Sequence, residues 1–149
     1  MIQIGKTAQN AIAVMSYLTE CTRDEIGPIN SQQAADARGI SKALAAKILT
    51  TLSQAGYVSG ATGPGGGYIL AKEPTSISLA DVVACFEVQN KEMMCPFGEG
   101  WCGKFEPCPL HDEIFRLKDE VQTFLSENHF GGFAEPGVSS KWPEGIRQK

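Results

Sequence analysis

The sequence predicts a mainly α-helical winged helix-turn-helix fold with a small β-hairpin wing and one further long helix. Three observations predict it. Two helical patterns joined by a glycine-bearing turn occupy residues 31–56, two short β-prone runs flank a Gly/Pro loop over 57–71, and an apolar repeat with heptad spacing covers 109–128. A hairpin directly after a helix-turn-helix is the arrangement of a wing.

The length and composition favour one domain with an appendage. The chain has 149 residues, of which 42% are hydrophobic, enough for a packed core. No apolar stretch approaches the roughly 18 residues that a membrane span needs, and the first residues lack the pattern of a signal peptide. We therefore expect a cytoplasmic protein without a membrane partner. In that reducing compartment, clustered cysteines favour metal or redox sites over disulfides.

The charge is unevenly distributed. The net charge is −4, yet residues 31–72 hold four basic residues and one acidic residue, so +4 − 1 = +3. A locally basic segment on an acidic protein favours a focused contact with phosphate over general polyanion binding.

Helical spacing and glycine stops define the first three elements. The apolar spacing predicts a helix over Thr7–Cys21. Ser31 is expected to cap a short helix that Gly39 ends. Ser41 is expected to cap the next helix, which runs to Gly56. The apolar residues of its buried stripe are Leu44, Ile48, Leu49 and Leu52.

The second half of the chain predicts the wing and two more helices. YVSG and YILA flank the loop ATGPGGG, which indicates a hairpin. Ser78 to Asp81 resembles a capping box and predicts a helix over Leu79–Glu87. A long helix is expected over Pro109–Asn128. Its heptad seam consists of Leu110, Ile114, Leu117, Val121 and Phe124.

The start of the second helix of the helix-turn-helix is the candidate recognition surface. Such a helix can place its first residues at base edges in the DNA major groove. Lys42 can reach phosphate or guanine, Ser41 can donate to phosphate, and small side chains allow close approach or a contact with a thymine methyl group. The candidate residues are Ser41, Lys42, Ala43, Ala46 and Lys47. The alternative is a merely solvated surface.

The glycine loop supports the DNA-binding interpretation. Gly63, Gly65, Gly66 and Gly67 remove the Cβ atoms from the loop tip, so the backbone can lie against phosphate or in the minor groove. A nucleotide-binding loop is less consistent with the sequence, because this loop precedes a predicted strand and not a helix. The candidate wing contacts are Thr62, Gly63, Pro64, Gly65 and Gly66.

A cluster of soft ligands follows. Its pattern is C-x6-C-x5-C-x2-H, at Cys95, Cys102, Cys108 and His111. Three thiolates and an imidazole suit either a Cys₃His zinc site or an iron–sulfur cluster, and the spacing leaves both open. Unligated surface cysteines are the remaining alternative. The cysteines at positions 21 and 85 are expected to be small buried hydrophobic residues.

These motifs together resemble a known family. The chain resembles, over about residues 1–130, the winged-helix regulators typified by IscR, NsrR and RirA (the Rrf-two family). The resemblance lies in ISKALAAKILTTLSQAGYV, then GPGGGYILA, then ISLADVVACFE, then three cysteines. The resemblance implies a homodimer whose long helices pack together, a palindromic double-stranded DNA operator, and an iron–sulfur cluster that controls DNA affinity. The implied organisation is a DNA-binding domain over 1–88, a cluster-binding loop over 89–108, a dimerisation helix over 109–130 and a flexible tail over 131–149.

This chain departs from the family pattern at its DNA-reading positions. Thr62 stands where many members carry an arginine that enters the minor groove. Ala46 stands near the position of a glutamate in IscR-like proteins. The operator sequence is therefore not carried over from the family.

The ligand pattern resembles one branch of the family more than the other. His111, three residues after the last cysteine, matches the histidine ligand of IscR-like 2Fe–2S sites. The six-residue gap between Cys95 and Cys102 is one residue longer than in many relatives. NsrR-like 4Fe–4S proteins recruit an acidic residue from the partner's first helix, where this chain has Gln9 and Asn10. The resemblance thus favours His111 as the fourth ligand and 2Fe–2S over 4Fe–4S. The open alternatives for the fourth ligand are Asp112, Glu113 and a residue of the other subunit.

The expected function is that of a homodimeric DNA-binding transcriptional regulator. Its operator affinity would be controlled by an iron–sulfur cluster that senses redox state, nitric oxide or iron and cluster supply. The alternative is a zinc-stabilised Cys₃His nucleic-acid-binding or adaptor module without redox sensing. An enzyme is not expected, because the sequence shows no catalytic triad, paired carboxylates or cofactor fingerprint.

Overall fold

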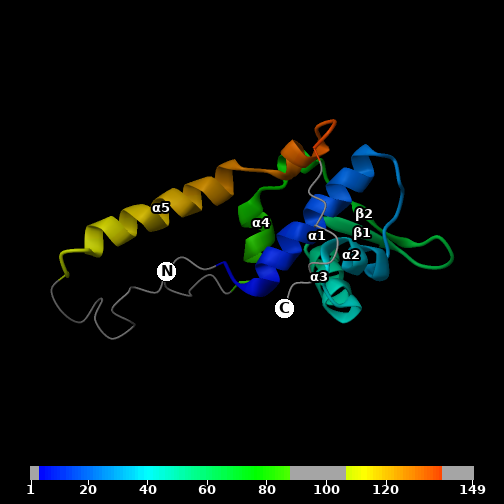
Figure 1. The fold of residues 1–149 in the computed structure, drawn as a ribbon, viewed down its shortest axis with the longest axis horizontal. Coiled ribbons are helices and arrows are strands. Elements are labelled where there is room, and N and C mark those ends of the chain that lie inside the picture. The colour runs from blue at the N-terminus through cyan, green and yellow to red at the C-terminus, as the bar shows by residue number, and fades with distance from the viewer. Residues whose placement is uncertain (1–3, 88–106, 139–149) are drawn as a thin grey trace.

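The computed structural model describes residues 4–87 and 107–138. The helical and strand order agrees with the predicted winged helix (Figure 1). The elements are α1 (Lys6–Arg23), α2 (Ser31–Arg38), α3 (Lys42–Gln54), β1 (Val58–Ala61), β2 (Gly67–Leu70), the 3₁₀ helix η1 (Pro74–Ser76), α4 (Leu79–Ala84), α5 (His111–Glu127) and the 3₁₀ helix η2 (Phe130–Ala134).

Helix α1 lies at the centre of the fold. It begins one residue earlier and ends two residues later than predicted, and α2, α3, α4, β2 and η2 all pack against it. Its apolar residues recur every three or four positions, so one broad face is buried. The main core contains, among others, Val14, Met15, Leu18, Ile29, Ile48, Leu49, Leu52, Ile77, Val82 and Phe130.

The helix-turn-helix forms as predicted, with one correction at its first cap. Asn30, and not Ser31, is the N-cap of α2, and it forms a capping box with Gln33 at 2.8 and 2.9 Å. The Asn30 side-chain oxygen can accept a hydrogen bond from the backbone N–H of the third helical residue, while the Asn30 backbone stays extended. Gly39 ends α2 in the left-handed conformation, with φ of 66°. Ser41 then caps α3, and its Oγ accepts from the Leu44 N–H at 3.1 Å.

The predicted hairpin is present and is tied to the body of the domain. Strands β1 and β2 pair antiparallel, with Val58 opposite Leu70. Ile29 adds a one-residue bridge to Tyr68, through two backbone hydrogen bonds of 3.0 and 2.8 Å. A Cβ on Gly67 would lie only 2.7 Å from the Ile29 carbonyl carbon, so this close backbone approach requires glycine.

Helix α4 is shorter than predicted. The capping box of Ser78 and Asp81 is present, at 2.9 and 3.1 Å. The helix ends at Ala84 and not at Glu87, and a turn follows. Helix α5 starts at His111, two residues after the predicted start, because Pro109 and Leu110 form a turn.

The segment after α5 corrects the expectation of a flexible tail from residue 131. Its described part, residues 128–138, which we call the strap, is folded against the domain. Phe130 is completely buried in the main core, and Phe133 packs against that core with its ring centroid 6.1 Å from that of Phe130. Aromatic side chains bury large apolar areas, so these two residues contribute strongly to the docking of the strap. Residues 139–149 lie outside the described residues.

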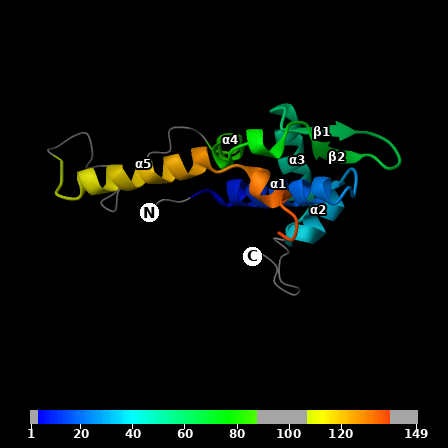
Figure 2. The ribbon, with the colours of Figure 1, turned by 90° about the horizontal axis from the view of Figure 1, so that it is seen from above.

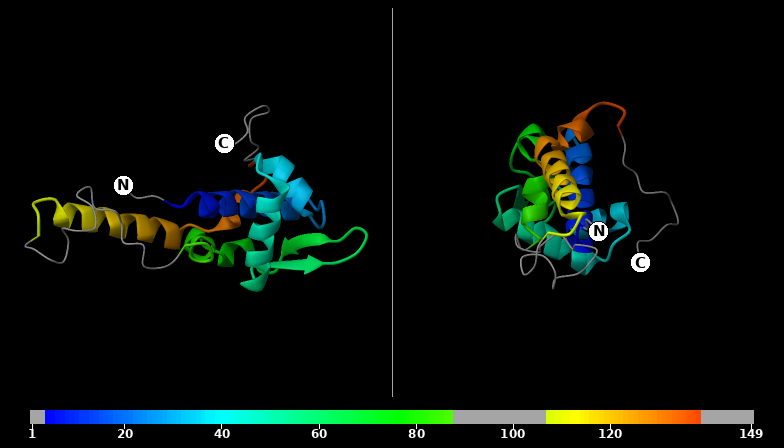
Figure 3. Two further views of the ribbon diagram at one scale, coloured as in Figure 1. Left: turned by 90° about the horizontal axis from the view of Figure 1, so that it is seen from below. Right: turned by 90° about the vertical axis from the view of Figure 1, so that its left-hand side faces the viewer.

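The elements spread along one long axis. The N-terminal turns of α5 and the loop of the wing lie at opposite ends of the molecule (Figures 1 and 2). Helix α3 runs across the direction of α1, with the hairpin beside it (Figure 3). Among the helices of residues 4–87 and 107–138, none combines the length and the apolar character needed to cross a membrane.

Candidate nucleic-acid interface and metal ligands

The start of α3 presents the predicted recognition residues to solvent. Ser41, Lys42, Ala43 and Lys47 are exposed, and Ala46 is half-buried. The opposite face of the helix is fully buried through Ala45, Ile48, Leu49 and Leu52. The amphipathic pattern therefore fixes which face of α3 is free to contact a ligand.

The wing loop is exposed and its backbone requires glycine. Residues 62–65 are exposed and Gly66 is half-buried. Gly63 and Gly65 adopt φ angles of 93° and 74°. A Cβ on Gly66 would lie 2.4 Å from the Ala61 carbonyl oxygen, which is far inside van der Waals contact. The result is a narrow, uncharged tip whose backbone is accessible.

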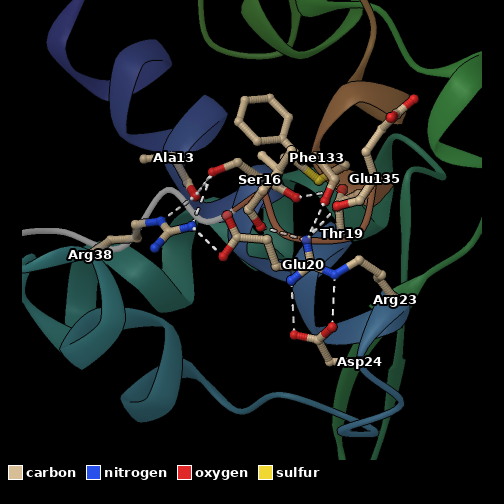
Figure 4. Close-up of polar contacts among 11 residues, drawn as sticks. Ala13, Ser16, Thr19, Glu20, Arg23, Asp24, Arg38, Phe133 and Glu135 are labelled. Carbon is tan, nitrogen blue, oxygen red and sulfur yellow. Dashed lines mark hydrogen bonds and ion pairs between the residues drawn. The ribbon is translucent and has the colours of Figure 1, made fainter.

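One basic residue of the predicted basic segment is not available to a ligand. The Arg38 side chain is 3% exposed. Its Nε donates to the Ala13 carbonyl at 2.8 Å and its Nη2 donates to Ser16 Oγ at 3.2 Å (Figure 4). Its Nη2 also lies 3.5 Å from a carboxylate oxygen of Glu20, which is 8% exposed. Burial lowers the pKa of Arg38, and the Glu20 carboxylate opposes that shift.

The sequence alone does not predict this buried ion pair. In the basic segment Arg38 has the pattern of a surface charge, and no motif marks Glu20. The signal that could have identified Glu20 is its position on the apolar face of α1, among Ser16, Leu18 and Thr19, which are all buried. A carboxylate there needs a partner, because an unpaired buried charge is costly.

Two of the four predicted metal ligands can be placed. Cys108 is half-buried and lies just before α5, and its carbonyl accepts the His111 N–H at 3.0 Å. The His111 ring lies 4.5 Å from the Phe115 ring. Cys95 and Cys102 lie outside the described residues. Within the described residues, no group of three or more His, Cys, Asp or Glu side chains is arranged to hold a metal ion.

The other two cysteines are packed into the fold. Cys21 is 2% exposed, and Cys85 is half-buried with its Sγ 3.3 Å from the Asp81 carbonyl. Burial raises the pKa of both thiols, which disfavours the thiolate that a metal needs. Their predicted role as small hydrophobic residues agrees with these environments.

Helix α5 carries an exposed apolar stripe. Leu110, Leu117 and Phe124 of the predicted seam are 47%, 50% and 55% exposed, and Phe115, which the seam prediction omitted, is 48% exposed. Leu125 is the buried contact of the helix and packs with Ala8 and Val83. Within the described residues, α5 therefore turns Leu125 inward and leaves Leu117 and Phe124 uncovered, with Phe115 about 160° around the helix from Leu117.

Known proteins resemble this chain over most of its length. The model of the Rrf2 family, described as iron-dependent transcriptional regulators, matches residues 4–135. An HTH-type transcriptional regulator of Aquifex aeolicus is 32% identical over 121 residues, covering 80% of this chain and 82% of the relative. The HTH-type transcriptional regulator IscR of Escherichia coli K12 is 29% identical over 125 residues, covering 84% of this chain and 76% of IscR.

Solved structures share the fold. CymR, the global cysteine regulator of B. subtilis, superposes with a TM-score of 0.74 at 22% identity, covering 90% of this chain and 97% of CymR. IscR of T. potens superposes with a TM-score of 0.70 at 20% identity, covering 95% of this chain and 94% of that structure. The match of the family model and the A. aeolicus relative identify the group to which the sequence belongs. The chain is a member of the Rrf2 family of helix-turn-helix transcriptional regulators and is not an enzyme.

Proposed function

We propose that the protein is a homodimeric regulator that binds a palindromic DNA operator through α3 and the wing, with an affinity controlled by an iron–sulfur cluster. The observation that carries the proposal is the pairing of an exposed, lysine-bearing start of α3 with a glycine tip whose backbone is accessible.

The chemistry of this surface suits a DNA duplex. Lys42 and Lys47 lie about 1.4 turns apart on α3, and both are exposed. Their ammonium groups can contact phosphate or guanine. Ala43 leaves room for close approach to a base pair. The neighbouring wing offers backbone without side chains, which suits the narrow minor groove. Thr62 gives the wing no positive charge, so the lysines of α3 would supply most of the electrostatic attraction.

The apolar stripe of α5 supports a dimer. Leu117 and Phe124 are half-exposed and separated by seven residues, the repeat of a coiled-coil seam. An exposed edge of this size on a monomer would be an aggregation hazard. A second α5 with the same seam would cover it, and two-fold symmetry would present two copies of α3 to two half-sites.

Cys108 and His111 fit an iron–sulfur cluster. They bring a thiol and an imidazole to the N-terminal end of α5, where the helix dipole favours a thiolate. Cys95 and Cys102 would complete the set. Such a cluster, when bound, supplies a centre whose charge and ligand bonds change on oxidation, nitrosylation or loss of iron. Because α5 also carries the stripe, the residues that would hold the cluster belong to the helix that would pair the subunits.

The DNA-binding part of the proposal is tested by salt dependence. The probe is the duplex that the wild-type protein selects from a randomised pool. Lys42→Ala and Lys47→Ala should each reduce, by about 0.9, the steepness with which the logarithm of the association constant falls with the logarithm of salt concentration. Lys6→Ala, which removes an exposed charge at the start of α1, serves as the matched control and should leave the slope unchanged. Unchanged slopes in both α3 variants would contradict the proposed surface.

The metal part is tested by the absorption spectrum of protein purified without oxygen. An iron–sulfur protein should be coloured and should contain iron and sulfide, and Cys108→Ala should bleach it. A colourless protein with one zinc per chain would instead support the Cys₃His zinc alternative.

A further inference from the structure

Three side chains are in contact along one face of α5, close to its start. The ring centroids of His111 and Phe115 lie 4.5 Å apart, and the ring planes are inclined by 41°. The Lys118 Nζ lies over the Phe115 ring, 5.7 Å from its centroid. Because these residues are separated by four and three positions, successive turns of the helix bring them side by side.

This face of α5 is not the face of the apolar stripe. At about 100° per residue, Phe115 lies about 160° around the helix from Leu117 and about 180° from Phe124. His111 lies only about 40° from Leu125, the residue that packs against the body of the domain. Pairing of two α5 helices through the stripe would therefore not cover Phe115, which is 48% exposed.

The backbone of His111 is already fixed at the start of the helix. His111 is the first residue of α5, and its N–H donates to the Cys108 carbonyl at 3.0 Å. That hydrogen bond leaves the imidazole able to rotate about its two side-chain bonds. A ring packed against the imidazole from the next turn restricts this rotation. Phe115 thus adds a restraint that the backbone cannot provide.

The geometry of the contact is favourable. A centroid separation of 4.5 Å is at the close end of the range over which aromatic rings attract each other. One such pair favours the packed orientation by about twofold to tenfold. The Lys118 ammonium is within the distance at which a cation is attracted to an aromatic face, so Lys118 in turn restrains Phe115.

We propose that Phe115 is a positioning residue for the metal ligand His111. The inference rests on the proposed function, since it requires His111 to be one of the cluster ligands. The Phe115 ring holds the imidazole in one orientation at the start of α5 and covers part of it from water. Residues that orient a metal ligand without binding the metal typically change metal retention by about tenfold or more when they are removed.

Labelling of the two histidines tests the contact in the cluster-free chain. Diethyl pyrocarbonate, at one fixed pH, modifies accessible imidazole nitrogens, and peptide mass mapping separates His111 from His129. His129 is exposed, lies beyond the other end of α5 and serves as the internal reference. In Phe115→Ala, the labelling rate of His111 relative to that of His129 should rise at least about twofold, the weak end of one aromatic pair.

Retention of the cluster tests the consequence. The coloured protein, purified without oxygen, is treated with an iron chelator, and the loss of its visible absorption is followed. Phe115→Ala should bleach about tenfold faster than the wild-type protein. Phe115→Tyr keeps the ring and should stay within about twofold of the wild-type protein in both measurements. Phe115→Leu keeps apolar bulk without a flat ring and should behave like Phe115→Ala.

The matched control is Glu120→Ala. Glu120 is exposed on the same helix and lies about 180° around it from His111. Its replacement changes the surface of α5 without reaching the imidazole, so the labelling ratio and the bleaching rate should both stay at their wild-type values.

The outcomes distinguish this inference from the proposed function. If the wild-type protein purified without oxygen is colourless, the cluster of the proposed function fails and the positioning role fails with it. If the protein is coloured and Phe115→Ala changes only one of the two rates, or neither, only the positioning role is overturned, because the effect does not pass through the imidazole. Wild-type rates in Phe115→Leu would overturn the ring contact as its basis. Faster labelling and faster bleaching in Phe115→Ala, both restored in Phe115→Tyr, support the role.

Discussion

Removing both members of the buried ion pair should destabilise the protein by clearly less than the sum of the two single removals. Arg38 and Glu20 are 3% and 8% exposed and lie 3.5 Å apart, so water screens neither charge. Breaking such a pair from one side costs about 3–5 kcal/mol, because the remaining charge is stranded. Arg38→Met also removes the donors to the Ala13 carbonyl and Ser16 Oγ, which places its expected cost near the upper end, about 4 kcal/mol.

The other variants follow from the same contacts. Glu20→Gln leaves Arg38 charged but still bonded to Ala13 and Ser16, so about 2 to 3 kcal/mol is expected. The double variant Glu20→Gln/Arg38→Met strands no charge and should lose only about 2 to 4 kcal/mol. The coupling energy between the two sites should therefore be at least about 2 kcal/mol.

Urea unfolding of the four proteins measures this cycle. With a slope near 2 kcal/mol/M, a loss of 4 kcal/mol moves the midpoint by about 2 M. Single-variant costs that simply add, with a coupling energy below about 0.5 kcal/mol, would refute the account of the pair. We assign Arg38 a structural role and no phosphate contact. If Arg38→Met reduced the steepness of the salt dependence of DNA binding by about one, that assignment would be contradicted.

Three further predictions concern other parts of the fold. The side-chain oxygen of Asn10 is buried and has no hydrogen-bond partner within the described residues. Asn10→Ala should therefore raise the free energy of unfolding by about 1 kcal/mol. If thermal or urea unfolding instead shows that the free energy of unfolding falls by that amount, the oxygen is hydrogen-bonded. Gly66→Ala should weaken binding to the selected duplex at least about tenfold, since its Cβ would lie 2.4 Å from a carbonyl oxygen. The matched control is Gly132→Ala, outside the wing, whose Cβ meets nothing within 4 Å and which should cost less than about threefold. Equal losses in a binding titration would argue against a steric requirement at the tip. Leu117→Asp together with Phe124→Asp should convert the protein to monomers in sedimentation experiments, because charges would face the partner's seam, and an unchanged mass would reject α5 as the dimer helix.

The DNA-binding half of the fold was predictable because its local signals agree with its packing. Gly39 and Ser41 mark the turn of the helix-turn-helix, and both adopt the expected conformations. The glycine loop between two β-prone runs predicted the hairpin in the same way. The shift of a cap from Ser31 to Asn30 reflects two adjacent residues with nearly equal capping ability.

The strap and the buried ion pair were not predictable from local patterns. FGGFAEPG has the composition of a loop, yet two of its aromatic residues reach the core formed by α1 and the segment before α4. Likewise, Arg38 is indistinguishable in sequence from a solvated charge until α1 brings Glu20 beside it. Both features depend on contacts between residues far apart in the chain, which periodicity does not encode.

The candidate site was predictable in part. The exposed start of α3 follows from its apolar stripe, and Lys42 and Lys47 are exposed as the helical spacing requires. For the ligand cluster, the described residues place Cys108 and His111 at the start of α5. Cys95 and Cys102 remain sequence-based assignments, because they lie outside the described residues.

The most direct test compares the DNA affinity of the same protein with and without its cluster. The wild-type chain, purified without oxygen, and its cluster-free form are titrated with one selected duplex at one fixed salt concentration. We predict dissociation constants that differ at least about tenfold, which corresponds to a coupling free energy of about 1.4 kcal/mol. Equal affinities of the two forms would contradict control of DNA binding by the cluster.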